Sequence, residues 1–182
     1  MSRATRRYVA LVRGLNVGGH GVISMAELRE QFQSLGVSDV STYIQSGNVL
    51  FTDHEPDRAR LTHRLEKGLA AVLDRPVTVF VLTRAELRNA AAHNPFDPAA
   101  RNATQQCQLM FLSAEPDAAH RKALMEMQGD EYRFHVRERV LYYAYDRSLA
   151  GHRRNIDFER VLGVAGTTRT WKVVDRLIRL LG

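Results

Sequence analysis

The order of strand-like and helix-like segments in the first half of the chain constrains its fold most strongly. Between residues 6 and 82, short β-rich runs alternate with two stretches that repeat apolar residues at helical spacing. The predicted strands cover residues 8–12, 40–45, 49–52 and 76–82, and the predicted helices cover residues 24–36 and 56–73. This order is that of the ferredoxin-like, or split βαβ, arrangement, in which two helices cover one face of a sheet.

The second half of the chain predicts a related order of elements. A strand at 106–112, a helix at 116–127, a hairpin over 132–145, a short helix at 156–162 and a last helix at 170–181 are expected. Two prolines within residues 94–98 interrupt regular structure between the halves. We therefore predict an α+β fold, with a ferredoxin-like subdomain at residues 1–93, a linker at 94–104 and a second α/β subdomain of related element order at 105–182.

Length and cysteine content narrow the class of protein. None of the apolar runs in the 182 residues approaches the about 20 residues of a membrane-spanning helix. The basic N-terminal segment leads into too few apolar residues for a signal peptide. Cys107, the only cysteine, allows neither an internal disulfide nor a Cys-x-x-Cys pair. These features favour a cytoplasmic protein without membrane association.

The formal net charge of +6 is compatible with binding to nucleic acid or another polyanion. However, the sequence contains no block of five or more like charges. We interpret its densest basic clusters, at residues 3–7, 133–139 and 152–154, as solvated surface. Tyr8 and Phe51 on the predicted sheet invite comparison with RNA-recognition modules, but the basic-glycine-aromatic signature of those modules is missing.

A glycine-rich segment joins the first predicted strand to the first predicted helix. Its glycines are Gly14, Gly18, Gly19 and Gly21. Such a segment can hold an anion, because glycine lets backbone N–H groups turn inward and a helix N-terminus carries partial positive charge. Arg13 and Asn16 would add side-chain donors. The segment matches neither the Walker A nor the Gly-x-Gly-x-x-Gly fingerprint, and the alternative is a long connection whose glycines only turn the chain.

Polar residues also crowd the predicted hairpin between the second and third strands. Gln45, Ser46 and Asn48 surround Gly47 and are candidate donors to the same anion. The alternative is turn chemistry, in which serine and asparagine bond to their own backbone. Ferredoxin-like topology is expected to place this hairpin and the glycine-rich segment at opposite ends of the sheet, so that only a folded-back loop would bring them together.

A third polar cluster precedes the last predicted helix, at residues 167–172. A threonine is expected to cap this helix, with Arg169 and Lys172 beside its first turn. A basic, hydroxyl-rich helix start can bind phosphate. The alternative is a simple cap with Trp171 packed in the core.

The seven histidines show no metal-ligand spacing, and the sequence predicts no metal site. His20 differs from the others because it lies within the glycine-rich segment. It is a candidate general base, although the sequence places no orienting carboxylate beside it.

Several of these segments together resemble a family of bacterial proteins, the domain of unknown function family 1697 (DUF1697). The matching residues are Leu11–Gly19, Met25–Leu28, Thr42–Val49 with Phe51, Asn94–Phe96, and Thr167–Arg169 with Trp171. The resemblance implies a bacterial cytoplasmic α+β protein with ferredoxin-like subdomains, and it implies no activity. Thr170 departs from the family pattern, which is expected to have asparagine before the tryptophan.

Three functional hypotheses follow from the sequence. The first is binding of a phosphate-bearing ligand, a nucleotide or a nucleic-acid backbone, by Arg13, Asn16, Gly18 and Gly19, with Gln45, Ser46, Asn48 and Arg169 as further donors. The second is an enzyme that acts on a small anionic substrate with His20 as base. The third is a structural or partner-binding module whose polar motifs only fix loops. The sequence assigns no cofactor and no oligomeric state.

Overall fold

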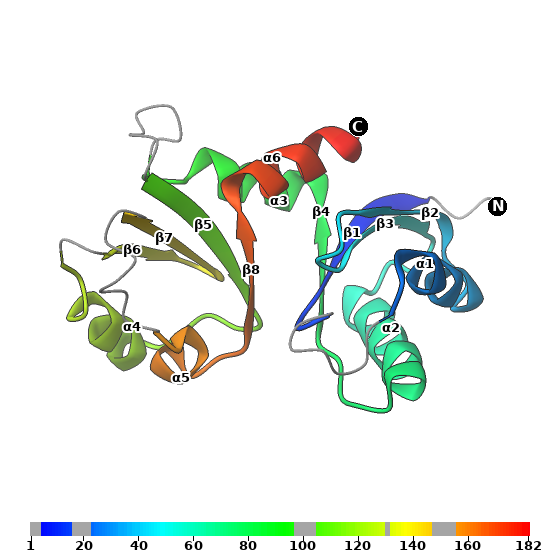
Figure 1. Ribbon diagram of the computed structural model, residues 1–182, viewed down its shortest axis with the longest axis horizontal. Coiled ribbons are helices and arrows are strands. Elements are labelled where there is room, and N and C mark those ends of the chain that lie inside the picture. The colour runs from blue at the N-terminus through cyan, green and yellow to red at the C-terminus, as the bar shows by residue number, and fades with distance from the viewer. Residues whose placement is uncertain (1–4, 16–22, 97–104, 130–131, 147–155) are drawn as a thin grey trace. The chain divides into compact units, whose positions relative to one another are not determined.

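The computed structural model describes residues 5–15, 23–96, 105–129, 132–146 and 156–182 (Figure 1). The chain separates into two compact units. The first unit contains Met1–Arg88 and Leu177–Gly182, and the second contains Asn89–Arg176. The linker predicted at 94–104 stays a prediction, because residues 97–104 lie outside the described part of the chain.

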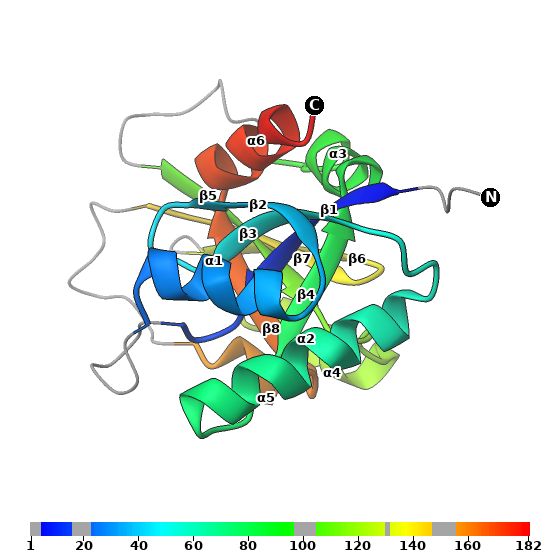
Figure 2. The same ribbon diagram turned by 90° about the vertical axis from the view of Figure 1, so that its right-hand side faces the viewer.

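The first unit contains one four-stranded sheet and two helices. Its strands are β1 (Arg6–Val12), β2 (Ser38–Tyr43), β3 (Asn48–Asp53) and β4 (Val79–Thr83), and its helices are α1 (Met25–Ser34) and α2 (Arg58–Leu73). The strand order is β2-β3-β1-β4, with every neighbouring pair antiparallel. Helices α1 and α2 cover one face of the sheet (Figure 2). This is the ferredoxin-like arrangement that the sequence predicts.

Alternate side chains of the strands point toward one face of the sheet and pack against the helices. Tyr8 on β1 and Phe51 on β3 point toward the helices, and their ring centroids are 5.7 Å apart. Phe32 of α1 packs on the same Phe51 ring, again at 5.7 Å. Helix α2 adds a row of leucines at helical spacing, which includes the fully buried Leu61 and Leu65. This apolar contact between sheet and helices is the core of the first unit.

The second unit repeats the topology of the first. Its elements are β5 (Gln105–Leu112), α4 (Ala118–Met125), β6 (Tyr132–Arg137), β7 (Val140–Asp146), α5 (Phe158–Leu162) and β8 (Gly166–Thr170). The strand order is β6-β7-β5-β8, with antiparallel neighbours. The helices α3 (Arg84–Ala92) and α6 (Trp171–Leu180) each begin in one unit and end in the other. The fold is therefore α+β, with a ferredoxin-like arrangement in each unit.

The sequence did not predict β8, because its hydroxyl-rich residues were interpreted as a helix cap. In the structure Thr167 and Arg169 lie on this strand, and Leu109 of β5 pairs with Arg169. Threonine is β-branched and favours strands as well as caps, so its side chain alone does not separate the two states. Thr170, the last residue of β8, interacts with the first turn of the last helix, because its Oγ1 accepts a hydrogen bond of 3.4 Å from the Val173 N–H.

Among the residues that the structure describes, none of the helices is long and apolar enough to cross a membrane.

Candidate functional site

The glycine-rich segment begins beside the β2–β3 hairpin. Leu11 of β1 pairs with Asn48 at the start of β3, and the Val12 N–H donates a 2.8 Å hydrogen bond to the Gly47 carbonyl. The expectation that the two segments lie at opposite ends of the sheet was therefore wrong. Because β1 and β3 are antiparallel, the C-terminal end of β1 lies beside the N-terminal end of β3.

The contact between these segments depends on a glycine at position 47. Gly47 has a φ of +70°, and a Cβ built there would lie 3.0 Å from the Val12 carbonyl oxygen and 3.2 Å from the Leu15 Cβ. A larger residue would meet both backbone strain and a steric clash. We refer to Arg13, Gly14, Leu15, residues 44–47 and Arg75 as the β1–hairpin corner.

Asn48 fixes the shape of the hairpin. Its side chain is fully buried, and its amide nitrogen donates to the Tyr43 carbonyl at 3.0 Å and to the Ser46 Oγ at 2.8 Å. Because a primary amide has two N–H groups, both are used inside the hairpin. These hydrogen bonds agree with the interpretation as turn chemistry, and they leave Gln45 and Ser46 as the exposed polar side chains of the turn.

Ile44 at the tip of the hairpin has an unusual conformation. Its φ is +51°, in the left-handed region, and 48% of the residue is exposed. A β-branched residue seldom adopts this backbone conformation, which costs about 1–3 kcal/mol where it occurs. The hairpin therefore presents an apolar side chain to solvent at the cost of backbone strain.

Two arginines flank the first residues of the glycine-rich segment. Arg13 is exposed, and its backbone N–H donates to the Thr78 carbonyl at 2.9 Å. Arg75, which lies between α2 and β4, donates from its guanidinium to the Gly14 carbonyl at 3.1 Å. Both cations therefore lie where the chain leaves β1. The next predicted site residues, Asn16, Gly18 and Gly19, lie outside the described residues, as does His20.

The N-terminus of α1 is already occupied by side chains from its own first turn. The Ser24 Oγ accepts from the Glu27 N–H at 3.1 Å, and the Glu27 carboxylate accepts from the Ser24 N–H at 2.8 Å. The bond from the Ser24 backbone lowers the pKa of Glu27. A carboxylate at this end of the helix offsets the partial positive charge that would favour an anion. The arginines therefore attract an anion more strongly than the N-terminus of α1 does.

Arg169 belongs to the second unit, on β8. Only 7% of the residue is exposed, and its guanidinium donates to the Thr167 Oγ1 at 2.9 Å and to the Thr168 carbonyl at 2.7 Å. Burial lowers the pKa of Arg169 to about 10, and the side chain remains charged near neutral pH. Arg169 therefore lies on the strand before the last helix, whose start keeps Thr170 and Lys172 from the predicted cluster.

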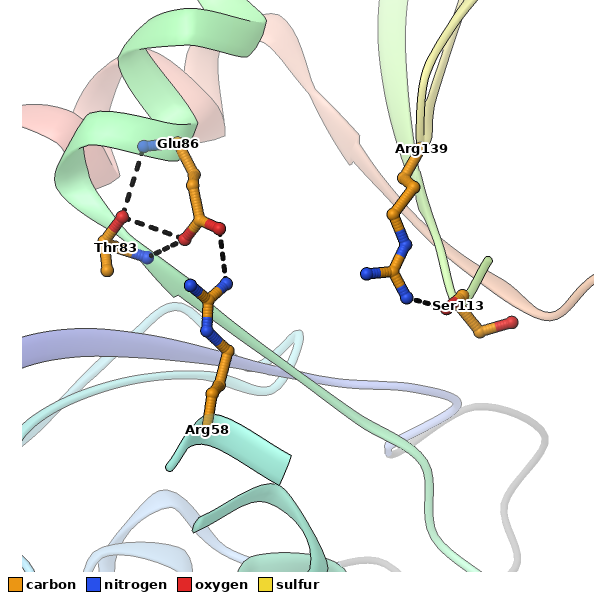
Figure 3. Close-up of polar contacts among 5 residues, drawn as sticks. All are labelled: Arg58, Thr83, Glu86, Ser113 and Arg139. Atoms are coloured by element: carbon orange, nitrogen blue, oxygen red, sulfur yellow. Dashed lines mark hydrogen bonds and ion pairs between the residues drawn. The ribbon is translucent and has the colours of Figure 1, made fainter. Parts of the chain in front are cut away.

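The second unit has a corner equivalent to the β1–hairpin corner. At the end of β5, the Leu112 N–H donates to the Arg139 carbonyl at 2.9 Å, and the Ser113 N–H donates to the Ala165 carbonyl at 2.8 Å. The Arg139 guanidinium also donates to the Ser113 carbonyl (Figure 3). We refer to Ser113, Glu138 and Arg139 as the β5–hairpin corner. Its arginine is used to close the connection between strand and helix.

Thr83 and Glu86 form a capping box, like that of Ser24 and Glu27, where β4 leads into α3. The Glu86 N–H donates to the Thr83 Oγ1 at 3.2 Å, and the Glu86 carboxylate accepts from the Thr83 N–H at 2.8 Å and from the Arg58 guanidinium (Figure 3). The bonds from Thr83 and Arg58 outweigh the opposing effect of burial and lower the pKa of Glu86. This network fixes the start of α3, and its charges are paired.

Arg75 is the corner residue that sequence reasoning missed. It stands among many arginines, immediately before Pro76, and nothing in its local pattern sets it apart. Arg75 lies close to the end of β1 because the chain returns to the sheet after α2. A signal was available in topology alone, because the turn before β4 lies at the same end of an antiparallel sheet as the end of β1.

Comparison with known proteins identifies the family. A family model described as a protein of unknown function (DUF1697) matches residues 5–142. The chain belongs to the DUF1697 family. The match includes the β1–hairpin corner, and it confirms the family that the glycine-rich and hairpin segments predict.

A solved structure is similar to this DUF1697 protein over nearly its whole length. It is the conserved bacterial protein SP0830 from Streptococcus pneumoniae, with 26% identity, a TM-score of 0.76, and coverage of 98% of this chain and 100% of that chain. No curated protein matches the chain. Neither the family description nor the name of the streptococcal protein states a ligand or a reaction.

Proposed function

We propose that the protein binds a phosphate-bearing ligand, a nucleotide or a nucleic-acid backbone, at the β1–hairpin corner. Arg13 and Arg75 would supply the positive charge, and Gln45 and Ser46 would supply neutral donors. Asn16, Gly18 and Gly19 of the glycine-rich segment would contribute as the sequence predicts. In this proposal Asn48 positions the hairpin, because its amide is bonded to Tyr43 and Ser46.

The observation that carries the proposal is the difference between the two equivalent corners. Each unit joins the end of its first strand to the following hairpin by the same backbone hydrogen bond. In the second unit residues 113–117 make a short connection, and Arg139 binds the Ser113 carbonyl. In the first unit Arg75 binds the Gly14 carbonyl in a similar way, but the connection is longer, residues 13–24, and Arg13 is a further exposed arginine beside the polar hairpin residues Gln45 and Ser46. The extra length of the connection and the additional arginine are not needed to build the fold.

The chemistry of these groups suits a phosphate. A guanidinium is charged across the physiological range and presents N–H groups in a plane that matches two oxygens of a phosphate. Serine and glutamine side chains add neutral donors that restrict the orientation of the ligand. Because the N-terminus of α1 holds Glu27, the arginines are assigned the main electrostatic contribution.

Removal of the two arginines tests the proposal. Binding of a nucleoside triphosphate mixture and of inorganic pyrophosphate is measured by isothermal titration calorimetry. Charge-assisted hydrogen bonds contribute about 1.5–3 kcal/mol each, so Arg13→Ala with Arg75→Ala is expected to weaken binding by tenfold or more, on the order of 1.4 kcal/mol per tenfold.

The matched control removes two other arginines from the same unit. Arg60 and Arg88 are exposed, and their replacement by alanine lowers the net charge equally. The control is expected to bind like the wild-type protein. Equal loss of binding in both double variants, or binding that survives in a folded Arg13→Ala, Arg75→Ala protein, would contradict the proposal.

A partner-binding function is the second candidate, and the conformation of Ile44 favours it. A strained, exposed isoleucine at a hairpin tip suits contact with an apolar patch on another protein. Ile44→Gly would relieve the strain and remove the apolar contact. This candidate predicts that the variant is at least as stable as the wild type and fails to retain a partner in affinity purification, with phosphate binding unchanged. The enzyme hypothesis rests on His20, outside the described residues, and stays a hypothesis.

A further inference from the structure

Each of the two sheets ends in two edge strands, and three of these four edges are bonded to side chains of their own unit. In β4 and β8, a glutamate of the preceding helix accepts from the N–H of the first strand residue, Val79 at 2.9 Å and Gly166 at 3.0 Å. In β6 the Phe134 N–H donates to the Gln128 side chain at 3.2 Å. Such contacts protect an edge strand, because they use backbone groups that would otherwise pair with another chain.

The fourth edge, β2, is open next to the hairpin. Because the Val12 N–H donates to the Gly47 carbonyl, the backbone groups of Asn48 are directed away from β1 and toward Tyr43, its partner on β2. The N–H and C=O of the preceding residue, Thr42, therefore point to the free edge. Within the part of the chain that the structure describes, neither of these two groups has a hydrogen-bond partner.

The other end of β2 is protected by a bulge. The register of β2 against β3 shifts between Ser38 and Ser41, and the exposed Asp39 has a φ of +51°. A bulge that carries a charged residue disrupts an edge as a place for pairing. An added strand would therefore pair with β2 at Thr42, where one residue can exchange two backbone hydrogen bonds with it.

An arginine lies beside this open position. Arg29 of α1 is half-buried, and its guanidinium donates to the Thr42 Oγ1 at 3.0 Å. Among the described residues Arg29 has no carboxylate partner, whereas Arg64, the half-buried arginine of α2, pairs with Asp53. A cation that is partly removed from water carries a desolvation cost, and an opposite charge offsets that cost. The open position on β2 therefore lies next to a positive charge that an incoming carboxylate can neutralise.

A second copy of this chain does not suit this edge. Since Thr42 is the residue with open backbone groups, two-fold pairing of β2 with itself would centre on Thr42 and place two Arg29 side chains close together. Like charges across a strand pair are destabilising, and opposite charges are stabilising. The charge at the edge therefore favours a partner strand with an acidic side chain over self-association.

We propose that the β2 edge, formed by Thr42 and Arg29, binds an extended segment of a partner protein that carries a glutamate or aspartate opposite Thr42. The segment would add a strand to the first sheet, by exchanging backbone hydrogen bonds with Thr42 and forming an ion pair with Arg29. The site uses neither arginine of the β1–hairpin corner, so it goes beyond phosphate binding. It names the class of partner for the second candidate function and rests on that candidate, since Ile44 directly follows β2.

Synthetic extended peptides test the proposal by fluorescence anisotropy. The probes are fluorescein-labelled Thr-Val-Thr-Glu-Thr-Val-Thr, the same peptide with lysine in place of glutamate, and the glutamate peptide with an N-methyl group on the glutamate nitrogen. The wild-type protein is expected to bind the glutamate peptide at least tenfold more tightly than the other two, because these lack either the ion pair or a backbone donor. Equal binding of the three probes, or binding of none of them, overturns the proposal.

Substitutions of Arg29 test its part in choosing the peptide. Arg29→Gln is expected to bind the glutamate peptide at least tenfold more weakly than the wild type. The matched control is Arg60→Gln, which removes an exposed arginine from α2 of the same unit and should bind like the wild type. Arg29→Glu is expected to prefer the lysine peptide, a reversal that a folding defect does not produce. Equal binding by Arg29→Gln and Arg60→Gln, or an unchanged preference in Arg29→Glu, overturns the proposal.

The β2 edge and the functions proposed above can fail separately. The Arg13→Ala, Arg75→Ala protein should bind the glutamate peptide like the wild type, and Arg29→Gln should bind pyrophosphate like the wild type. Loss of peptide binding in the Arg13→Ala, Arg75→Ala protein but not in Arg29→Gln would contradict the β2 edge and leave the phosphate corner standing. If Ile44→Gly loses the peptide and Arg29→Gln keeps it, the partner-binding candidate stands and the β2 edge fails.

Discussion

The two hairpin corners of this protein share the same backbone hydrogen bonds but differ in their side chains and in the length of the connection. In each unit the last residue of the first strand donates to the hairpin carbonyl, and the next residue donates to the segment before the fourth strand. The β5–hairpin corner closes over a short connection with the Arg139 guanidinium. The β1–hairpin corner has a similar bond from Arg75 to the Gly14 carbonyl, but it adds a long glycine-rich connection and a buried asparagine, and its left-handed residue is an isoleucine where the other hairpin has Glu138. Since one corner shows what the fold requires, the additions at the other corner are candidates for function.

The largest expected effect concerns the glycine that holds the β1–hairpin corner together. Gly47→Ala combines a left-handed φ with a Cβ only 3.0 Å from the Val12 carbonyl oxygen. We expect a loss of about 2–4 kcal/mol in the free energy of unfolding, measured by urea denaturation. Gly14→Ala is the matched control, because Gly14 also has a positive φ, of +63°, but its Cβ would meet nothing within 4 Å. It should cost about 1 kcal/mol. Equal losses would mean that close approach does not define this corner.

The next comparison concerns the first residues of β3 and β7, the strands that follow the hairpin in each unit. Leu11 pairs with Asn48 in one unit, and Phe111 pairs with Val140 in the other. Asn48→Ala would leave the Tyr43 carbonyl and the Ser46 hydroxyl without this amide, at a cost of about 1–3 kcal/mol. Val140→Ala removes only part of a half-buried side chain and should cost about 1 kcal/mol. Thermal unfolding of the two variants measures the difference, and a smaller loss at Asn48 would contradict its role in fixing the hairpin.

The arginines of the two corners should separate stability from binding. Arg139→Ala removes a donor to the Ser113 carbonyl and is expected to cost about 0.5–1 kcal/mol of stability without changing phosphate binding. Arg13→Ala should show the reverse, with a stability change within about 0.5 kcal/mol and weaker phosphate binding. Urea denaturation and calorimetric titration of both variants measure the two effects. If Arg139→Ala also weakens binding, the distinction between a structural corner and a binding corner fails.

The sequence predicted the first unit better than the second, for physical reasons. The helical spacing of apolar residues, such as Leu61 and Leu65 in α2, is a local signal, and the structure has α1 and α2 close to the predicted ranges. Strand β8 was missed because its threonines favour caps as well as strands, and pairing with β5 decides between the two.

The sites were harder to predict than the elements, because they are assembled by long-range pairing. The sequence placed the hairpin and the end of β1 apart, whereas their antiparallel pairing places them together. Arg75 reaches the Gly14 carbonyl from a segment distant in sequence, and Phe96 reaches the Arg133 guanidinium in the same way. Composition and spacing carry no information about such contacts, since they depend on register and on the return path of each helix.

The smallest expected effect is a change in stability with pH. It compares the carboxylates at the N-termini of the equivalent helices α1 and α4. Hydrogen bonds from the Ser24 backbone and side chain lower the pKa of Glu27, and bonds from the His120 backbone and side chain lower the pKa of Asp117. A carboxylate whose pKa is lower in the folded state stabilises the protein above its unfolded pKa. That stability is lost as the pH falls through the folded pKa. Glu27→Gln and Asp117→Asn should therefore differ from the wild type near neutral pH and converge with it in acid.

The two helix caps differ in the pH at which the stability of the variant begins to approach that of the wild type. The ordinary pKa values are 4.5 for Glu27 and 3.8 for Asp117, so the Glu27→Gln difference should begin to shrink at the higher pH. Urea midpoints measured from about pH 6 to about pH 3 would show this order. Ser24→Ala is the control, because it removes the hydroxyl partner of Glu27 while the carboxylate remains. A difference that persists unchanged to the lowest pH would show that the carboxylate charge does not stabilise α1.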